Sequence, residues 1–523
     1  MNNLDKKASS LMPILLLIVY LIVTGFSLNR YPLVWVDEGW IGEVAAQAAR
    51  GLPLGSPSHG TLYRYEDRIF WMPPLYFYEL GGVFRLAGVD LLVGRWFNVF
   101  IGGLSTLALF AFLRRRVAVG AALSAALFFA FDTFVWKTHR TIRFESLLTL
   151  FGVLLFISVI VALEREESAR PASGAWVAAG LIAGLALNVH PNAILLITAM
   201  LVMATVRRGW SLFRRPGPWL ALTVAFSLAL PYLLYLWSDS VTGFANVIGQ
   251  NSFHLDHGVT EGWAPLREWR RWSDFFVLPW RLPMLAAWLT LIGLALMRAA
   301  GGWVARGTFA GSRPAVPAAD DAAVGARHHL LVSALTVLGV FVTLLLFLPN
   351  KTLLYLASAA PFVAVLGAAL WHGEAFVRWP RLLARLALTG GIIASLAVNA
   401  GLVWRHRDCH AAKDLERIRA AIAPEERVAG TFVTWWATQP RSATLPPRPF
   451  HEFSRGASLE AVQRFGATSI LLGDRQWQQE VSTRFAPLNR ELIGSGGPLI
   501  DTTPTLEMPE SCLGPVRLYS LER

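Results

Sequence analysis

The chain has 523 residues, of which 54% are hydrophobic and only 16% are charged, and its mean hydropathy is +0.46. Soluble globular proteins carry about 25% charged residues, so this composition excludes a purely soluble protein. Because 12% of the residues are aromatic, it also excludes a disordered chain. The net charge of +12 does not indicate nucleic-acid binding. The tail from Arg405 onward is nearly neutral, with 15 of the 47 basic residues and 14 acidic residues, and the surplus of positive charge lies among the apolar segments before it.

Eleven apolar segments are long enough to cross a bilayer, whose core of about 30 Å requires about 20 apolar residues per helix. They are 11–28, 92–113, 117–136, 144–163, 175–190, 191–206, 218–237, 282–298, 329–348, 352–371 and 382–403. Pro191 separates the fifth segment from the sixth, because proline interrupts a helix. No small-residue cleavage site follows the first segment, so we expect a retained anchor rather than a signal peptide.

The distribution of charge predicts the orientation. With the N-terminus in the cytoplasm, the inner loops hold 18 basic and 7 acidic residues, whereas the outer loops are nearly balanced. This asymmetry is what the positive-inside rule requires. Eleven spans then place the C-terminus outside, so we predict an integral plasma (inner) membrane protein with a cytoplasmic N-terminus and a periplasmic tail.

We therefore expect an α-helical polytopic membrane protein of about eleven or more spans, with residues 1–403 in the membrane region and residues 404–523 in a separate extracytoplasmic domain. Three outer loops, 29–91, 137–145 and 238–281, are long enough or polar enough to carry a catalytic site. The Gly-, Ala- and Pro-rich segment 299–328 is typical of a flexible inner linker.

The tail alternates segments of helical and extended pattern, which predicts a small α/β domain. Helical spacing occurs at 411–422 and 458–466, and extended patterns occur at 427–433, 467–473 and 514–521. Both cysteines of the chain, Cys409 and Cys512, lie in this tail. An extracytoplasmic disulfide between them and two unpaired thiols are equally compatible with the sequence.

Polar residues at a membrane boundary are costly and are therefore the first candidates for function. Asp37 and Glu38 form an acidic pair directly after the first span. One interpretation is structural, because carboxylates in the first turn of a helix interact favourably with its dipole and with its free N–H groups. The other interpretation is a general base at the edge of an aqueous cavity.

The outer end of the fourth apolar segment contains His139, Arg140, Arg143 and Glu145. Two arginines one helical turn apart could bind a phosphate in bidentate fashion, or they could simply anchor the segment at lipid head groups.

Other candidate site residues lie at the outer ends of later segments. His190 and Asn192 flank a proline between two short spans, and a histidine in that position is more often a packing residue than a ligand. Lys351 and Tyr355 lie at the entrance of the tenth segment. His254, Asp256 and His257 have a spacing that could hold a divalent metal, although a single short loop is weak evidence for one.

Four motifs occur in one order on the predicted outer face. They are the acidic pair after the first span, the Pro-Pro-Leu-Tyr sequence at 73–76 leading into Gly-Val-x5-Arg-x2-Asn at 88–98, the Arg140–Phe151 run and the Lys351–Phe362 run. Over about residues 11–400 this order resembles membrane glycosyltransferases of the GT-C fold. The most similar family is the dolichyl-phosphate-mannose–protein mannosyltransferases (glycosyltransferase family 39), with bacterial relatives that include the aminoarabinose transferases of lipid A.

The resemblance implies a polyprenyl-phosphate sugar as donor and transfer at the outer leaflet. It implies that Asp37 is the base, with Glu38 beside it, and that Glu145 stands where the family usually has aspartate.

By the same resemblance Arg140 and Arg143 would neutralise the departing lipid phosphate, and Lys351 and Tyr355 would close the donor site. The chain has Trp71-Met72 where many family members have a charged residue before the proline pair, so Arg64 or Arg68 would have to supply that charge.

Two other classes of function are compatible with many spans. A transporter or lipid flippase usually carries internal repeats and a binding site in the middle of the bilayer, and neither is visible here. A non-catalytic assembly protein would use the outer tail to bind a partner. Within the enzyme class, the acceptor could be an envelope protein, lipid A or another glycan, because nothing in the tail selects among them.

Overall fold

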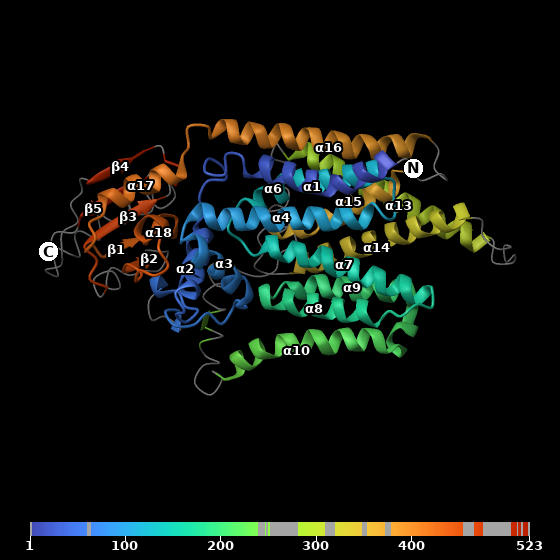
Figure 1. Ribbon diagram of the computed structural model, residues 1–523, viewed down its shortest axis with the longest axis horizontal. Helices are drawn as coiled ribbons and strands as arrows, with labels where there is room; N and C mark the ends of the chain where they lie inside the picture. Colours follow the sequence, from blue (N-terminus) through green and yellow to red (C-terminus); the bar gives the residue numbers. More distant parts are fainter. Residues whose placement is uncertain are drawn as a thin grey trace.

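The computed structural model describes residues 3–59, 64–238, 246, 249–250, 281–308, 319–347, 353–371, 378–452, 465–473, 504–509, 511–513 and 516–520. Long helices run side by side along the molecule, and a small sheet with two helices lies at one end (Figure 1). The N-terminus lies at the opposite end of the bundle from the sheet.

Every predicted apolar segment coincides with helical structure. The long helices are α1 (Asn3–Gly25), α4 (Leu91–Leu113), α5 (Val119–Phe131), α7 (Glu145–Glu167), α8 (Ser173–Val189), α9 (Ala193–Arg208), α10 (Pro216–Ser238), α13 (Leu282–Thr308), α14 (Ala319–Phe347), α15 (Ala360–Leu370) and α16 (Arg378–Arg405). Among the described helices, seven are long and apolar enough to span a membrane, or eight with one bent pair counted, and three shorter helices are apolar. The chain is an integral membrane protein, as predicted.

Two details of the prediction are wrong. The segment 117–136 is not one helix, because it breaks at Asp132 and continues as α6 (Thr133–His139) after a bend of 62°. One oxygen of Asp132 accepts the backbone N–H groups of Phe134 and Val135, and the other accepts the indole N–H of Trp288 at 2.9 Å. A carboxylate that caps a new helix in this way stops the preceding one.

The other error concerns the two ends of the segment 299–328, for which the sequence predicts a flexible linker; residues 309–318 lie outside the described residues. Helix α13 extends to Thr308, and α14 begins at Ala319. Both extensions are rich in alanine, the residue with the highest helix propensity. The break at Pro191 is confirmed, because α8 ends at Val189 and α9 begins at Ala193.

The C-terminal region contains a five-stranded mixed sheet of order β2-β1-β3-β5-β4. Its strands are β1 (Val428–Gly430), β2 (Phe450–Glu452), β3 (Ser469–Gly473), β4 (Leu506–Met508) and β5 (Val516–Ser520), and its helices are α17 (Ala411–Ala421) and α18 (Phe432–Thr438). Strands β1, β2 and β3 are parallel, whereas β5 pairs antiparallel with β3 and β4. The predicted α/β character is confirmed; α18, β2 and β4 are absent from the prediction, and most of 458–466 lies outside the described residues.

A disulfide joins Cys409 to Cys512, with a Cα–Cα distance of 5.3 Å, so the first of the two alternatives is confirmed. It links the residues directly after α16 to the segment before β5. The backbone N–H of Cys512 donates to Asp414 at 2.8 Å, and its carbonyl accepts the N–H of Val34 at 3.4 Å. The bond therefore holds the C-terminal region against the turn that follows α1.

Helices α2 (Val36–Ala49) and α3 (Leu75–Ala87) lie between the sheet and the ends of the long helices (Figure 1). Helix α18 packs directly on α2. A Cβ atom added at Gly39 would overlap the backbone of Phe432, and one added at Gly42 would overlap the indole of Trp436. The two glycines therefore permit the close approach of the C-terminal region to α2.

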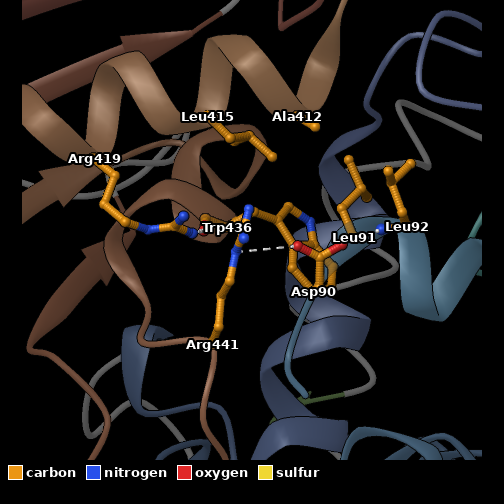
Figure 2. Close-up of a pocket in the computed structure, with 8 residues that line it drawn as sticks. All are labelled: Asp90, Leu91, Leu92, Ala412, Leu415, Arg419, Trp436 and Arg441. Carbon is orange, nitrogen blue, oxygen red and sulfur yellow. Dashed lines mark hydrogen bonds and ion pairs between the residues drawn. The ribbon is translucent and has the colours of Figure 1, made fainter. Parts of the chain in front are cut away.

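A small cleft marks the same junction on its other side (Figure 2). Its volume is about 280 Å³, part of which is open solvent. Arg441 forms an ion pair with Asp90, the N-cap of α4, at 3.5 Å, and its carbonyl accepts the N–H of Val89 at 2.6 Å. The indole of Trp436 lines this cleft and also contacts α2. This one side chain therefore connects the C-terminal region to α2 and to the beginning of α4.

The contact between Gly42 and Trp436 is testable by substitution. Gly42→Ala should lower the midpoint of thermal unfolding in detergent, because overpacking a tight contact costs about 1–3 kcal/mol. Gly82→Ala is the matched control, since a Cβ atom at Gly82 in α3 meets no atom within 4 Å. It should raise the midpoint slightly, because alanine is favoured over glycine inside a helix by about 0.5–1 kcal/mol. Equal shifts for the two variants would contradict the tight packing.

Glu43 of α2 is buried and organises the loop before α3. Its carboxylate accepts hydrogen bonds from the hydroxyls of Ser56 and Ser58 and from the N–H of Ser58 at 3.3 Å. Ser56 Oγ also lies 2.7 Å from Nδ1 of His59. Burial, only partly offset by these hydrogen bonds, raises the pKa of Glu43 from 4.5 to about 7, and Arg50 is the neighbouring cation.

This raised pKa predicts how stability depends on pH. The folded protein binds a proton at Glu43 more tightly than the unfolded chain does, so the carboxyl contributes stability below pH 4.5 that is lost as the pH rises to about 7. In Glu43→Gln the amide imitates the protonated carboxyl and cannot titrate. The unfolding midpoint of the wild type should therefore fall more than that of the variant between about pH 5 and pH 8. Parallel curves for the two proteins would refute the assignment.

Candidate active site

The site is built on the turn between α1 and α2, which two buried arginines hold in place. The guanidinium of Arg140 donates to the carbonyl oxygens of Thr24, Phe26 and Tyr31, at 2.9 Å for Phe26 and at 2.6 and 3.1 Å for Tyr31. These carbonyls lie at and after the C-terminal end of α1, where a cation also interacts favourably with the helix dipole. Arg95 donates to the carbonyl of Leu28 in the same turn at 3.0 Å.

The first turn of α2 is fixed by a buried ion pair. Arg95 of α4 donates to both carboxylate oxygens of Glu38, at 2.9 and 2.7 Å, and neither side chain is exposed to solvent. Glu38 also accepts the backbone N–H groups of Trp35 and Ile142, each at 3.0 Å. Glu38 is therefore the N3 residue of a capping box whose N-cap is Trp35, and it links α2 to the loop that precedes α7, which fits the structural interpretation of the acidic pair for this residue.

The second ion-pair group lies beside the first. Arg143 donates from Nε and Nη2 to the carboxylate of Glu145, at 2.7 to 3.0 Å, and from Nη1 to Asp37 Oδ2. Burial alone would lower the pKa of Arg143, but the charges of Glu145 and Asp37 raise it above its ordinary value. The guanidinium is thus permanently charged, and all the donors named here are already used by carboxylates.

Asp37 differs from its neighbours in its access to solvent. Its side chain is 41% exposed, whereas Arg143 and Glu145 are almost completely buried. Within the described part of the chain, Oδ1 of Asp37 has no hydrogen-bond partner, so one carboxylate oxygen is directed by Arg143 and the other is open. An anchored carboxylate with one open oxygen is the geometry that a general base requires.

His190 and Tyr355 lie next to this group. The ring of His190 packs on Phe144 with centroids 4.7 Å apart, and its Nε2 lies 3.5 Å from the hydroxyl of Tyr355 in η4 (Leu353–Ser358). Burial, and then the charge of Arg143, lowers the pKa of His190 to about 3. The ring is therefore neutral at physiological pH, and its Nδ1 accepts the N–H of Asn192 at 3.0 Å.

Two residues that the sequence analysis does not single out, Lys137 and Arg95, also contribute to the site. The ammonium of Lys137 and the guanidinium of Arg143 both lie against the indole of Trp35, at 5.4 and 5.1 Å from the ring centroid. The sequence carries one signal for Lys137, because a lysine directly after an outer apolar segment departs from the positive-inside pattern. The other residue, Arg95, is part of a quoted motif but has no role in the sequence prediction.

The structure thus brings together Asp37, Glu38, Arg143, Glu145, His190, Asn192 and Tyr355. It places three other expected residues elsewhere, and their roles stay predictions. The Arg140 guanidinium donates to the backbone carbonyls described above. His139 is buried between α1 and α4, where Nδ1 is 2.8 Å from the hydroxyl of Tyr20. Arg64 is ion-paired with Asp67 at 3.8 Å.

Four expected ligands, Lys351, His254, Asp256 and His257, lie outside the described residues. The divalent metal that the last three were expected to bind therefore stays a prediction.

Comparison with known proteins agrees with this geometry. Residues 72–235 match the model of a family described as dolichyl-phosphate-mannose-protein mannosyltransferase. No curated protein matches the sequence significantly.

Among solved structures, ArnT from Cupriavidus metallidurans is similar over the whole chain. Its apo form has a TM-score of 0.59 and 14% identity, with 98% of both chains covered. Its complex with undecaprenyl phosphate has the same score and identity, with 97% of both chains covered. An oligosaccharyltransferase from Archaeoglobus fulgidus has a TM-score of 0.50 and 12% identity, with 88% of this chain and 68% of that chain covered. The GT-C fold predicted from the sequence is confirmed.

The buried pair of Arg95 and Glu38 can be tested by a double-mutant cycle. Arg95→Met or Glu38→Gln alone should lower the free energy of unfolding by about 3–5 kcal/mol, because either leaves a buried charge without its partner. The double variant should lose less free energy of unfolding than the two single variants together, since it leaves no uncompensated charge. Additive losses, measured from denaturation in detergent, would show that the two side chains do not depend on each other.

Proposed function

We propose that this protein transfers a sugar from a polyprenyl-phosphate carrier to an acceptor hydroxyl or phosphate group at the outer face of the membrane, with Asp37 as the general base. The observation that carries the proposal is the carboxylate of Asp37, which is partly exposed and held by the buried guanidinium of Arg143. The fold and the family match over residues 72–235 favour the same class of reaction.

The reaction needs few protein groups. As the acceptor oxygen bonds to the anomeric carbon, the bond from that carbon to the phosphate oxygen breaks, and its electron pair leaves with the phosphate. The proton of the acceptor passes to the open oxygen of Asp37. Because the sugar is already activated by its phosphate, no nucleotide-binding site is required, and none of the glycine-rich nucleotide motifs occurs in the sequence.

The residues around Asp37 would have separate tasks. Arg143 orients the base, and Glu145 orients Arg143 through two parallel hydrogen bonds. Glu38 is fully engaged by Arg95 and by two backbone N–H groups, so it positions α2 rather than exchanging protons with a substrate. His190 and Tyr355 form a packed wall beside this ion-pair group.

The position of the site fits an outward-facing enzyme of the bacterial inner membrane. Helices α2 and α3 and the C-terminal sheet all lie at one end of the bundle, and the N-terminus lies at the other (Figure 1). A cluster of ion pairs at the C-terminal ends of α7 and α9, including those of Arg207 with Glu167 and of Arg208 with Glu166, occupies the end predicted to be cytoplasmic. The acceptor would be an envelope protein or glycolipid brought to the outer face.

The base can be tested with a purified protein and a mass-spectrometric lipid assay. Extracted polyprenyl-phosphate sugars and envelope acceptors are mixed with the wild type, and release of free polyprenyl phosphate is measured. Asp37→Asn should lower the rate by about 10²–10⁴-fold, because it removes the proton acceptor and leaves the shape of the side chain unchanged.

Asp408→Asn is the matched control, because this side chain is 93% exposed beside the disulfide, and it should retain the wild-type rate. Normal transfer by a folded Asp37→Asn protein would refute the base. If the wild type releases no polyprenyl phosphate across a broad set of donors, the function proposed here is wrong, and a transporter becomes the better interpretation.

A further inference from the structure

Lys137 shares the indole of Trp35 with Arg143, the residue that holds the proposed base, and it lies outside the motifs by which the chain resembles its family. We infer that its ammonium group, held on the indole of Trp35 near Asp37, is the cation that receives the phosphate of the polyprenyl carrier. This inference rests on the function proposed above, and it assigns the task of binding the departing phosphate to one residue.

The first step is the elimination of the two arginines that the sequence favours for this task. The guanidinium of Arg140 is buried and donates to three carbonyl oxygens of the turn after α1. Arg143 uses Nε and Nη2 on Glu145 and Nη1 on Asp37. Both guanidinium groups therefore spend most of their five N–H donors on acceptors within the protein, which leaves few of them for a phosphate.

The second step is the condition of Lys137 itself. Its side chain is partly buried at the end of α6, and its ammonium lies 5.4 Å from the ring centroid of Trp35. Across the described ranges its Nζ donates no hydrogen bond and forms no ion pair. A lysine ammonium carries three N–H donors, and a partly desolvated charge without an acceptor is costly. The donors of this group are therefore not used by the described residues, and an anion such as a phosphate can accept them.

The third step is the balance of charge around it. The carboxylates of the site are Asp37, Glu38 and Glu145, and its cations are Arg95, Lys137, Arg140, Arg143 and Arg281. Among these described residues the cations outnumber the carboxylates. Arg281 and Arg143 are the cations that act on Lys137, and Glu38, the nearby anion, is already paired with Arg95. A phosphate monoester, with about two negative charges, would offset this excess of positive charge.

The fourth step is the position relative to the base. Arg143 contacts both Asp37 and the indole of Trp35, and Lys137 contacts the same indole. The base and the proposed phosphate ligand are therefore both placed by residues that meet at Trp35. A displacement at the anomeric carbon needs the base on the acceptor and positive charge on the leaving oxygen at the same moment. Trp35 sets the spacing between these two groups.

The inference is tested by direct binding of undecaprenyl phosphate to the full-length protein in detergent, followed by native mass spectrometry or by tryptophan fluorescence. Lys137→Met keeps the aliphatic stem but removes the charge, so it should weaken binding of undecaprenyl phosphate by about tenfold or more. Lys137→Arg should restore most of the affinity, because it returns a cation. Undecaprenol, which has no phosphate, should bind equally to all the variants.

Lys413→Met is the matched control, because Lys413 is an exposed lysine on α17, and it should bind the probe as the wild type does. Wild-type affinity for undecaprenyl phosphate in a folded Lys137→Met protein would overturn the inference and leave the proposed function intact. If the wild type itself neither binds undecaprenyl phosphate nor releases it in the transfer assay, both the inference and the proposed function are wrong.

A second probe separates the two sources of phosphate. Glucosamine 1-phosphate represents the phosphorylated head group of a glycolipid acceptor. If Lys137→Met loses affinity for this probe but not for undecaprenyl phosphate, the lysine belongs to the acceptor side, and the inference is overturned. Loss of affinity for undecaprenyl phosphate alone supports it.

Discussion

The arrangement of the site depends on the cost of burying arginine. Arg95, Arg140 and Arg143 are almost completely buried at one end of the helix bundle, and a guanidinium there must find acceptors for its five N–H donors. Arg95 donates to a carboxylate and a carbonyl, Arg140 donates to carbonyls, and Arg143 donates to two carboxylates. Together these acceptors come from α1, α2, α7 and the turn after α1, so satisfying the three charges forces these helices into one relative position.

Asp37 is the outlying member of this network, and its exposure follows from its neighbours. Glu38 pairs with Arg95, and Glu145 accepts from both Nε and Nη2 of Arg143. Asp37 needs to supply only one oxygen to complete the pairing of Arg143, which leaves the other open. The network therefore holds the carboxylate of the proposed base in place without saturating it, and the C-terminal region packs α18 on α2 through Gly39 and Gly42.

Sequence patterns predict part of this site and miss another part for identifiable reasons. Adjacent carboxylates after an apolar segment indicate Asp37 and Glu38, but the pattern does not reveal that Glu38 is buried against Arg95 while Asp37 is partly exposed. Arg140 and Arg143 look equivalent, since both follow the same segment three residues apart. They differ in the structure because Arg140 faces the carbonyls after α1 whereas Arg143 faces α2 and Glu145.

Hydropathy, periodicity and the order of motifs along the chain were enough to predict an integral membrane protein, the places of its helices, an α/β tail and the GT-C fold. The first three properties depend on local sequence patterns. Such patterns can be recognised in the sequence without knowing how the helices pack. Which charged residues meet, the bond between Cys409 and Cys512 and the place of Lys137 beside Trp35 became visible only in the folded molecule. Those contacts join residues that are far apart in the chain or on different elements. They form only when the helices pack, because only then does each buried charge need a partner.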